Sequence, residues 1–162
     1  MIKALITITS EMNVDIQRQT EAGQQPDDPD ICSWATAAYL GDNVEMEMTV
    51  RIVDEDESSQ LNETYRHKSG PTNVLSFPYE NPPGVELALL GDLVICAPVV
   101  AREANEQQKT CQAHWAHMVV HGTLHLQGYD HIEPDAASQM EQLETDILAR
   151  LGYSNPYELT GS

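Results

Sequence analysis

Histidines are concentrated in one segment of the chain, and their spacing there suits metal binding. Four of the six histidines are His114, His117, His121 and His125. On a helix that advances about 100° per residue, all four fall within a stripe about 80° wide. One ion cannot bind all four, because the first and the last lie about 16 Å apart along the helix axis. Two imidazoles four residues apart, however, have the helical spacing with which zinc is commonly held.

The position of a third ligand decides which pair binds the metal. Gly128 follows His125 by three residues and suits a left-handed helix end, after which the chain can reverse and bring His131 beside the last turn. We therefore expect one Zn²⁺ per chain, held by His121, His125 and His131. Three imidazoles without a fourth protein ligand leave a position open for water, which is typical of catalytic zinc. The alternative is that these are core or surface histidines without a metal.

Neighbouring polar residues have more than one interpretation. His117 either supports a metal ligand through a hydrogen bond, relays a proton, or is an ordinary core histidine. Asp130 either orients a ligand imidazole or stabilises the turn after the helix. His114 is expected to be structural.

The segment also matches the pattern H-x-x-x-H-x-x-G-x-x-H of the metzincin zinc peptidases, with one difference. Those enzymes carry glutamate directly after the first histidine, as the base that takes a proton from the zinc-bound water. Here that residue is Gly122. The difference argues against peptide hydrolysis by the metzincin route.

The elements that must position these residues are indicated by hydrophobic periodicity and by helix start and stop signals. Strict alternation over residues 44–53 predicts a half-buried strand, with Val44 and Ile52 at the two ends of its apolar face, whereas residues 11–30 are weakly patterned. Asp92 interrupts an apolar run, and we expect it to make buried hydrogen bonds rather than to act in catalysis. Strands are expected at residues 3–9, 44–53, 72–78 and 86–97, and helices at 29–40, 57–66, 99–107, 110–127 and 134–151.

This order of elements predicts an α+β fold for residues 1–162 as a single domain. About four strands should form a small mixed sheet, packed with about five helices. The zinc site then lies on a late helix and the turn that follows it.

Charge and cysteine content restrict the partners and the compartment. The net charge of −18 argues against broad affinity for nucleic acid, because phosphate binding needs positive surface. Basic residues cluster only in the segment YRHKSG, in which Arg66 and Lys68 flank His67. Three widely spaced cysteines without a C-x-x-C motif indicate reduced thiols. With no signal peptide or membrane span apparent in the sequence, we expect a soluble cytoplasmic protein.

Three longer strings, YRHKSGPTNVLSFPYE, LLGDLVI and HWAHMVVHGTLHLQGYDH, closely resemble the bacterial YbeY family of metal-dependent endoribonucleases. The resemblance runs from about residue 1 to residue 157. It implies a single α+β domain, a zinc ion on the three histidines named above, and a functional need for Arg66. It also implies a role in maturation of the 3′ end of 16S ribosomal RNA and in late-stage ribosome quality control. Expected partners are ribosomal RNA, the small ribosomal subunit, and a small-subunit ribosomal protein or ribosome-associated GTPase.

The favoured hypothesis is a zinc-dependent endoribonuclease acting on single-stranded RNA, with His121 and Arg66 as catalytic residues. The guanidinium of Arg66 is a planar fork that suits phosphate oxygens. Lys68 either contacts RNA at the periphery or is an ordinary surface lysine. Two alternatives remain: a non-catalytic ribosome-assembly factor with a structural metal, and, more weakly supported, a zinc hydrolase of another substrate.

Overall fold

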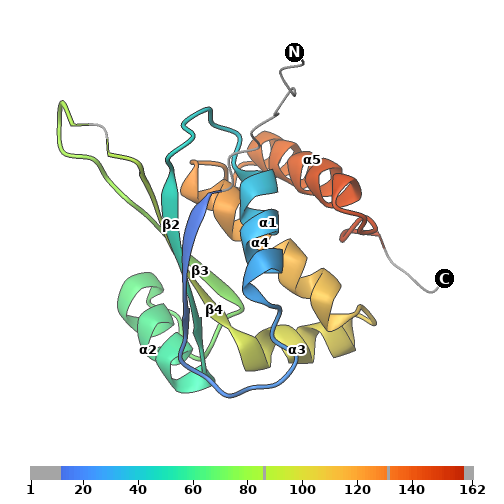
Figure 1. The fold of residues 1–162 in the computed structure, drawn as a ribbon. Coiled ribbons are helices and arrows are strands. Elements are labelled where there is room, and N and C mark those ends of the chain that lie inside the picture. The colour runs from blue at the N-terminus through green and yellow to red at the C-terminus, as the bar shows by residue number, and fades with distance from the viewer. Residues whose placement is uncertain (1–11, 86, 131, 159–162) are drawn as a thin grey trace, which may run out of the picture.

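The structure is a computed structural model that describes residues 12–85, 87–130 and 132–158. Within these ranges the chain forms a four-stranded sheet and five helices (Figure 1). The strand expected at residues 3–9 lies outside the described residues. In chain order the elements are β1 (Asn13–Arg18), α1 (Asp28–Ala38), β2 (Glu47–Val53), α2 (Glu55–Arg66), β3 (Val74–Pro78), β4 (Leu89–Cys96), α3 (Ala97–Glu106), α4 (Cys111–Leu126) and α5 (Pro134–Arg150).

The sheet is mixed, as predicted, and its spatial order is β1-β2-β4-β3. β1 pairs with β2 and β2 with β4 in parallel, and only β3 runs antiparallel, against β4. Parallel neighbours need crossover connections. α1 makes the first of these, and α2 together with β3 makes the second.

One strand was not predicted, and the other three were predicted too long. β1 lies in the weakly patterned stretch, where Val14 and Ile16 are the apolar residues, both only partly buried, and the other residues are polar. In β2, Met48, Val50 and Ile52 form the predicted buried face. Val44 precedes the strand and is 66% exposed, so the alternating pattern continues beyond the strand itself.

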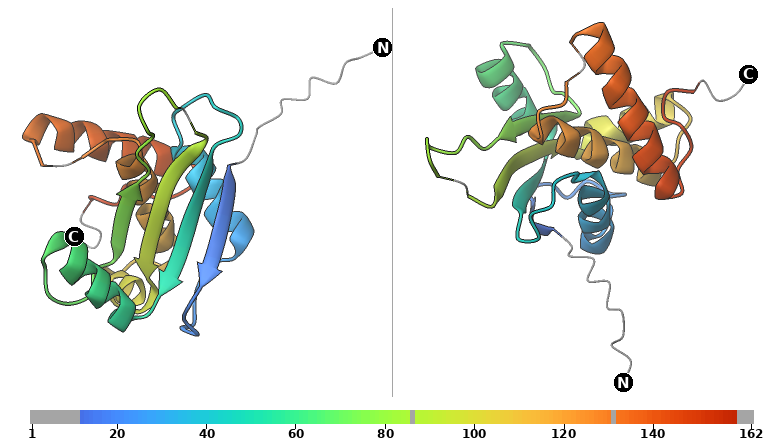
Figure 2. Two further views of the ribbon diagram at one scale, coloured as in Figure 1. Left: turned by 90° about the vertical axis from the view of Figure 1, so that its left-hand side faces the viewer. Right: turned by 90° about the horizontal axis from the view of Figure 1, so that it is seen from above.

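The two faces of the sheet are covered unequally. The main core cluster joins one face to α1, α4 and α5, and a smaller cluster of Val53, Leu75, Val94, Cys96 and Val99 lies on the other, next to Leu61 of α2. Figure 2 shows α2 and the three core helices on opposite sides of the sheet. None of the helices in the described ranges has the length and apolarity needed to cross a membrane.

Asp92 does not have the predicted buried role. Its side chain is exposed, because alternation along β4 turns Leu93 toward α4 and turns Asp92 to the opposite face. The residues paired with Asp92 on the adjacent strands are Thr49 and Phe77, and they do not bury its side chain.

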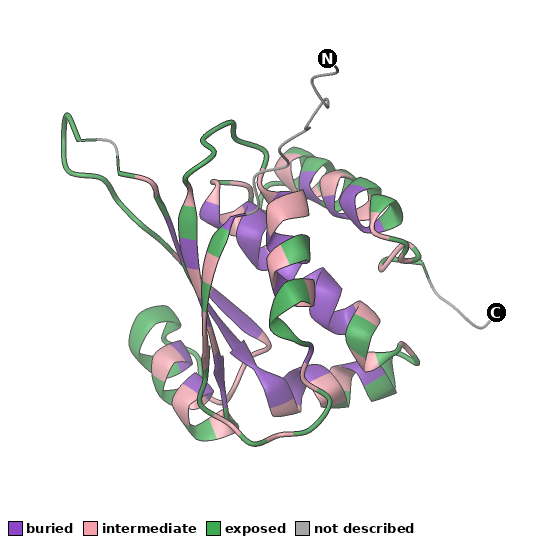
Figure 3. Ribbon diagram, in the orientation of Figure 1, coloured by how far each residue is buried: buried purple, intermediate pink, exposed green. Residues whose placement is uncertain are grey.

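Helix α4 is the most deeply buried helix, and it carries the histidine stripe (Figure 3). Thr110 caps its N-terminus by accepting a hydrogen bond from the N–H of Ala113 at 3.0 Å. Trp115, Val119 and Leu124 are at most 1% exposed. Because α4 packs against β3 and β4 on one side and against α1, α3 and α5 elsewhere, it is a rigid support for the side chains that it carries.

Candidate metal centre and its cavity

The four histidines of α4 form a continuous row, as the helical spacing predicts. Successive ring centroids lie 6.0, 6.0 and 4.5 Å apart from His114 to His125. His114 and His117 are buried, whereas His121 and His125 are partly exposed. The row therefore runs from the protein interior toward the surface, and its last two members can be reached by a ligand.

His121 and His125 are arranged as two ligands of one metal ion would be. Their Nε2 atoms lie 3.0 Å apart. Two nitrogens bound tetrahedrally to zinc at their usual bond lengths would lie roughly 3.3 Å apart. The pair fits a single ion with only a small adjustment of the rings.

The turn after α4 has the predicted left-handed glycine. Gly128 has a φ of 97°, and its N–H donates to the carbonyl of His125 at 3.0 Å. His131 lies outside the described residues, so the set of three histidines stays a prediction. Its chain neighbours Asp130 and Ile132 both line the cavity that His121 and His125 line.

This cavity, of about 690 Å³, brings the basic cluster to the histidines. Helix α2, strand β3, helix α4 and the following turn all contribute to it, and its polar lining is Arg66, Asn73, Ser76, His121, His125 and Asp130. Lys68 is exposed, and within the described chain it is not among the lining residues. The cavity therefore brings Arg66 together with His121 and His125, and among the described residues Lys68 lies outside its lining.

Arg66 is the arginine that lines this cavity. It is the last residue of α2, and the left-handed His67 at φ 57° ends the helix directly after it. Among the described residues, the arginines in salt bridges are Arg18, Arg51 and Arg102, and no salt bridge involves Arg66. Its guanidinium is exposed at the cavity and is available to an anionic ligand.

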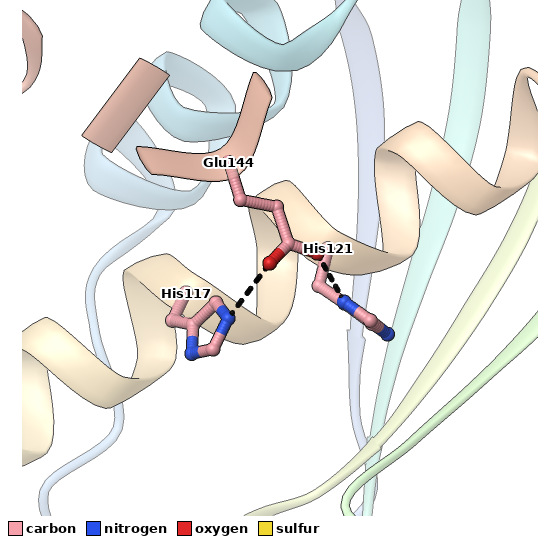
Figure 4. A group of neighbouring side chains, drawn as sticks. All are labelled: His117, His121 and Glu144. Atoms are coloured by element: carbon pink, nitrogen blue, oxygen red, sulfur yellow. Dashed lines mark hydrogen bonds and ion pairs between the residues drawn. The ribbon is translucent and has the colours of Figure 1, made fainter. Parts of the chain in front are cut away.

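Glu144 is a site residue that the sequence analysis missed. It lies on α5, is 0% exposed, and accepts hydrogen bonds from Nδ1 of His121 and, at 3.2 Å, from Nε2 of His117. The hydroxyl of Tyr157 donates to the same carboxylate. Figure 4 shows Glu144 reaching from α5 to both histidines, with the second ring nitrogen of His121 pointing away from it.

The ligand atoms of His117, His121 and Glu144 lie within 4.8 Å of one another, so these three residues could also hold a metal ion. Two arrangements around His121 are therefore present. One uses Nε2 together with His125, facing the cavity, and the other uses Nδ1 together with Glu144, in the interior.

Hydrogen bonding decides the charge of this buried group. Burial by itself would raise the pKa of Glu144, but hydrogen bonds from His117 and His121 lower it to about 2. Burial also lowers the pKa of His117, against the opposing effect of Glu144. Glu144 is therefore an anion at neutral pH, and His117 is a neutral imidazole. Because His117 donates through Nε2, its Nδ1 is an acceptor, and this atom is buried without a hydrogen-bond partner in the described part of the chain.

The remaining candidates take structural positions. His114 is buried, and its Nε2 lies 2.8 Å from Oε1 of Glu103, as its expected structural role requires. His117 is connected to His121 through Glu144. Asp130 accepts a hydrogen bond from the N–H of Ile132 at 3.2 Å, which is the turn-stabilising arrangement considered from the sequence.

Gly122 faces the sheet and not the metal centre. A Cβ atom built at this position would lie 2.7 Å from Cδ2 of Leu93 and 3.2 Å from Cγ2 of Val74. Glycine therefore allows α4 to approach the sheet closely. A glutamate here would point into the core, so the fold gives no place to the peptidase base.

Substituting Gly122→Glu should destabilise the protein without creating peptidase activity. The carboxylate would be forced against Leu93, and overpacking together with an unpaired buried charge should cost at least about 3 kcal/mol. Urea unfolding measures the loss. Gly23→Glu is the matched control, since its Cβ would meet nothing within 4 Å, and it should change stability by less than about 0.5 kcal/mol. A Gly122→Glu protein as stable as the wild type would contradict this packing argument.

Two comparisons with known proteins bear on this chain. The solution structure of TM1509 from Thermotoga maritima is similar to it with a TM-score of 0.52 and 22% identity, over 90% of this chain and 99% of that one. At this identity the likeness shows the fold alone. The family model described as Endoribonuclease YbeY matches residues 15–152, which include Arg66, the histidine row and Glu144. The chain therefore belongs to the YbeY family of endoribonucleases, metal-dependent hydrolases of phosphodiester bonds.

Proposed function

We propose that the chain is a zinc-dependent endoribonuclease specific for single-stranded RNA, acting in the cytoplasm on the 3′ end of 16S ribosomal RNA and in late-stage ribosome quality control. The observation that carries this proposal is the shared cavity, in which Arg66 lies with the converging Nε2 atoms of His121 and His125. A cation and a metal centre on one cavity suit a phosphodiester, which is anionic in both its ground and transition states.

In this proposal zinc is bound by Nε2 of His121 and of His125, with His131 as the third ligand. The interior alternative is less suitable, because Glu144 has no exposed surface and both of its oxygens already accept hydrogen bonds. When bound, the ion would supply a Lewis acid for the scissile phosphate. Imidazole ligands also accept nickel, copper and cobalt, so zinc itself is part of the proposal.

Arg66, which lines the same cavity, would bind the same phosphate. A guanidinium donates two parallel hydrogen bonds to phosphate oxygens. Donors fixed in position before the reaction stabilise the charge that gathers on phosphorus. Among the described residues Arg66 is in no salt bridge, which supports this role, because no such contact would have to be broken first.

An exposed aromatic ring supports a preference for unpaired RNA. Tyr65 is 62% exposed, lines the cavity next to Arg66, and is held edge-on by Phe77 at a centroid distance of 5.2 Å. Proteins bind single-stranded RNA by stacking unpaired bases on such rings. A duplex has no unpaired bases to offer. Lys68, exposed two residues after Arg66, would contact a phosphate farther along the strand.

The acidic composition makes delivery to the substrate part of the proposal. With a net charge of −18, the protein as a whole would repel the RNA backbone. Specificity would then come from a preassembled target, the small ribosomal subunit, contacted through a ribosomal protein or a ribosome-associated GTPase.

Binding to free RNA should accordingly be weak and only mildly dependent on salt. Two phosphate contacts, by Arg66 and Lys68, give a slope of log K against log salt of roughly −1.4 for single strands. Affinity and 3′-end cleavage should rise sharply when the same RNA is presented in small subunits that carry an unprocessed 3′ end. The control is RNA stripped of protein from those subunits. Tight, sequence-blind binding to the stripped RNA would contradict the proposal.

A further inference from the structure

We propose that Glu144 is a positioning residue of the metal centre: its buried carboxylate holds the Nδ1 proton of His121 and thereby aims Nε2 of that ring at the ion. This inference rests on the proposed function, because it takes Nε2 of His121 as the metal ligand. It assigns Glu144 a role in holding the ligand and not in binding the ion.

Because Glu144 is buried, its carboxylate does not contribute to solubility. It occupies a core-facing position of α5, in the same stripe as Met140, Ile147 and Leu148, and is 0% exposed. An ionised carboxylate is strongly unfavourable in such a place unless donors satisfy it. Three donors do so, from α4 and from the segment after α5. A leucine would pack there without needing any of them.

The contact with His121 determines which nitrogen of the neutral ring carries the lone pair. A neutral imidazole carries one proton, and the hydrogen bond made by one nitrogen determines the role of the other. With Glu144 accepting from Nδ1, the lone pair of His121 is on Nε2, which lies 3.0 Å from Nε2 of His125. Metal-binding histidines are commonly held by a carboxylate in this manner.

The carboxylate is itself prevented from rotating. Oε1 accepts from His121, whereas Oε2 accepts from Nε2 of His117 at 3.2 Å and from the hydroxyl of Tyr157. The rings of His117 and Tyr157 meet edge to face at 5.4 Å. Tyr157 thus connects the segment after α5 to the metal centre through Glu144.

A second carboxylate–histidine contact on α4 provides a matched control. Oε1 of Glu103, on α3, lies 2.8 Å from Nε2 of His114, two turns before His121 on α4. This pair repeats the carboxylate–imidazole contact away from the proposed ion. Glu103→Gln should therefore reproduce any general effect of losing such a pair, without affecting the metal.

The test compares zinc affinity, by chelator competition, and the urea stability of the metal-free protein in four variants: Glu144→Gln, Glu103→Gln, Tyr157→Phe and His125→Ala. Glu144→Gln should raise the zinc Kd by roughly 10- to 100-fold. Tyr157→Phe, which removes a single hydroxyl and leaves the fold, should raise it by a smaller factor. Glu103→Gln should leave it unchanged, and His125→Ala should lose zinc.

A second measurement is independent of metal and of activity. In the metal-free wild type, ¹⁵N NMR of the neutral His121 ring should show the proton on Nδ1, and in Glu144→Gln a mixture of tautomers. Unchanged zinc affinity in Glu144→Gln would overturn the positioning role, even if the wild type is a zinc ribonuclease. Loss of zinc in Glu144→Gln with full retention in His125→Ala would also overturn it, because Glu144 would then be a ligand. If the wild type binds zinc but does not cleave RNA, the proposed function fails. The zinc affinity and the His121 tautomer in Glu144→Gln still test the positioning role of Glu144 in that case.

Discussion

Replacing Arg66 with alanine is expected to slow RNA cleavage by at least about 100-fold while the protein stays folded and still binds zinc. The guanidinium of Arg66 lines the cavity, and among the described residues it is in no salt bridge. In the proposed function it binds the scissile phosphate. Loss of one fixed donor to a developing charge lowers kcat by about 10²- to 10³-fold. Stability should fall by no more than about 1 kcal/mol, because the side chain is an exposed helix-end cation.

The measurement is kcat on a defined single-stranded RNA, with zinc content determined on the same samples. Arg102→Ala is the matched control, since Arg102 is also exposed but its partner is Glu55 at 3.2 Å on the surface. Arg66→Lys should recover only part of the rate, because an ammonium lacks the planar fork. Cleavage by Arg66→Ala at the wild-type rate would remove Arg66 from the mechanism.

The elements with long or strongly patterned segments were predictable from the sequence. The apolar run containing Leu93 and Ile95 forms a central strand, and the histidine-bearing segment forms a helix with Thr110 and Gly128 at its ends. β1 was not predictable, because an edge strand whose apolar residues are Val14 and Ile16 alone has a weak hydrophobic pattern. The exposure of Asp92 depends on which face of the sheet the helices cover, and periodicity alone does not give that.

The metal centre was partly predictable for a similar reason. The alignment of His121 and His125 follows from helical spacing, which is local. Glu144 comes from another helix, and no local rule states that α5 crosses α4 at this point. A signal was nevertheless present, since Glu144 interrupts an apolar stripe that includes Met140 and Ile147. An acidic residue at a core position indicates a buried partner, and the histidine row was the available one.

The presence of Arg66 in the same cavity was not derivable from spacing. Helix α2 ends beside β3, and β3 packs against α4, so three elements must assemble before Arg66 lies near the histidines. The sequence offered the basic cluster and the family resemblance as indications. The first of these also included Lys68, which the fold leaves outside the cavity lining among the described residues.

Removing the metal should stop cleavage and leave the protein folded. The core around Trp115, Val119 and Leu124 is packed without any contribution from the ion, so metal-free protein should unfold cooperatively. Adding zinc back at 100 times its Kd should restore cleavage and stabilise the fold by about 2.7 kcal/mol. Thermal unfolding and RNA cleavage, measured on the same chelated and reconstituted samples, check both parts.

Substitution of the ligands separates catalytic from structural metal. His125→Ala should lose zinc and activity with a modest loss of stability. His121→Ala should lose both as well, with a larger loss of stability, because it also takes a donor from the buried Glu144. If the metal is only structural and joins the helix to the turn, chelation should lower stability, and the metal-bound protein should not cleave RNA. Undiminished cleavage by rigorously metal-free His121→Ala protein would show that the reaction does not pass through this centre.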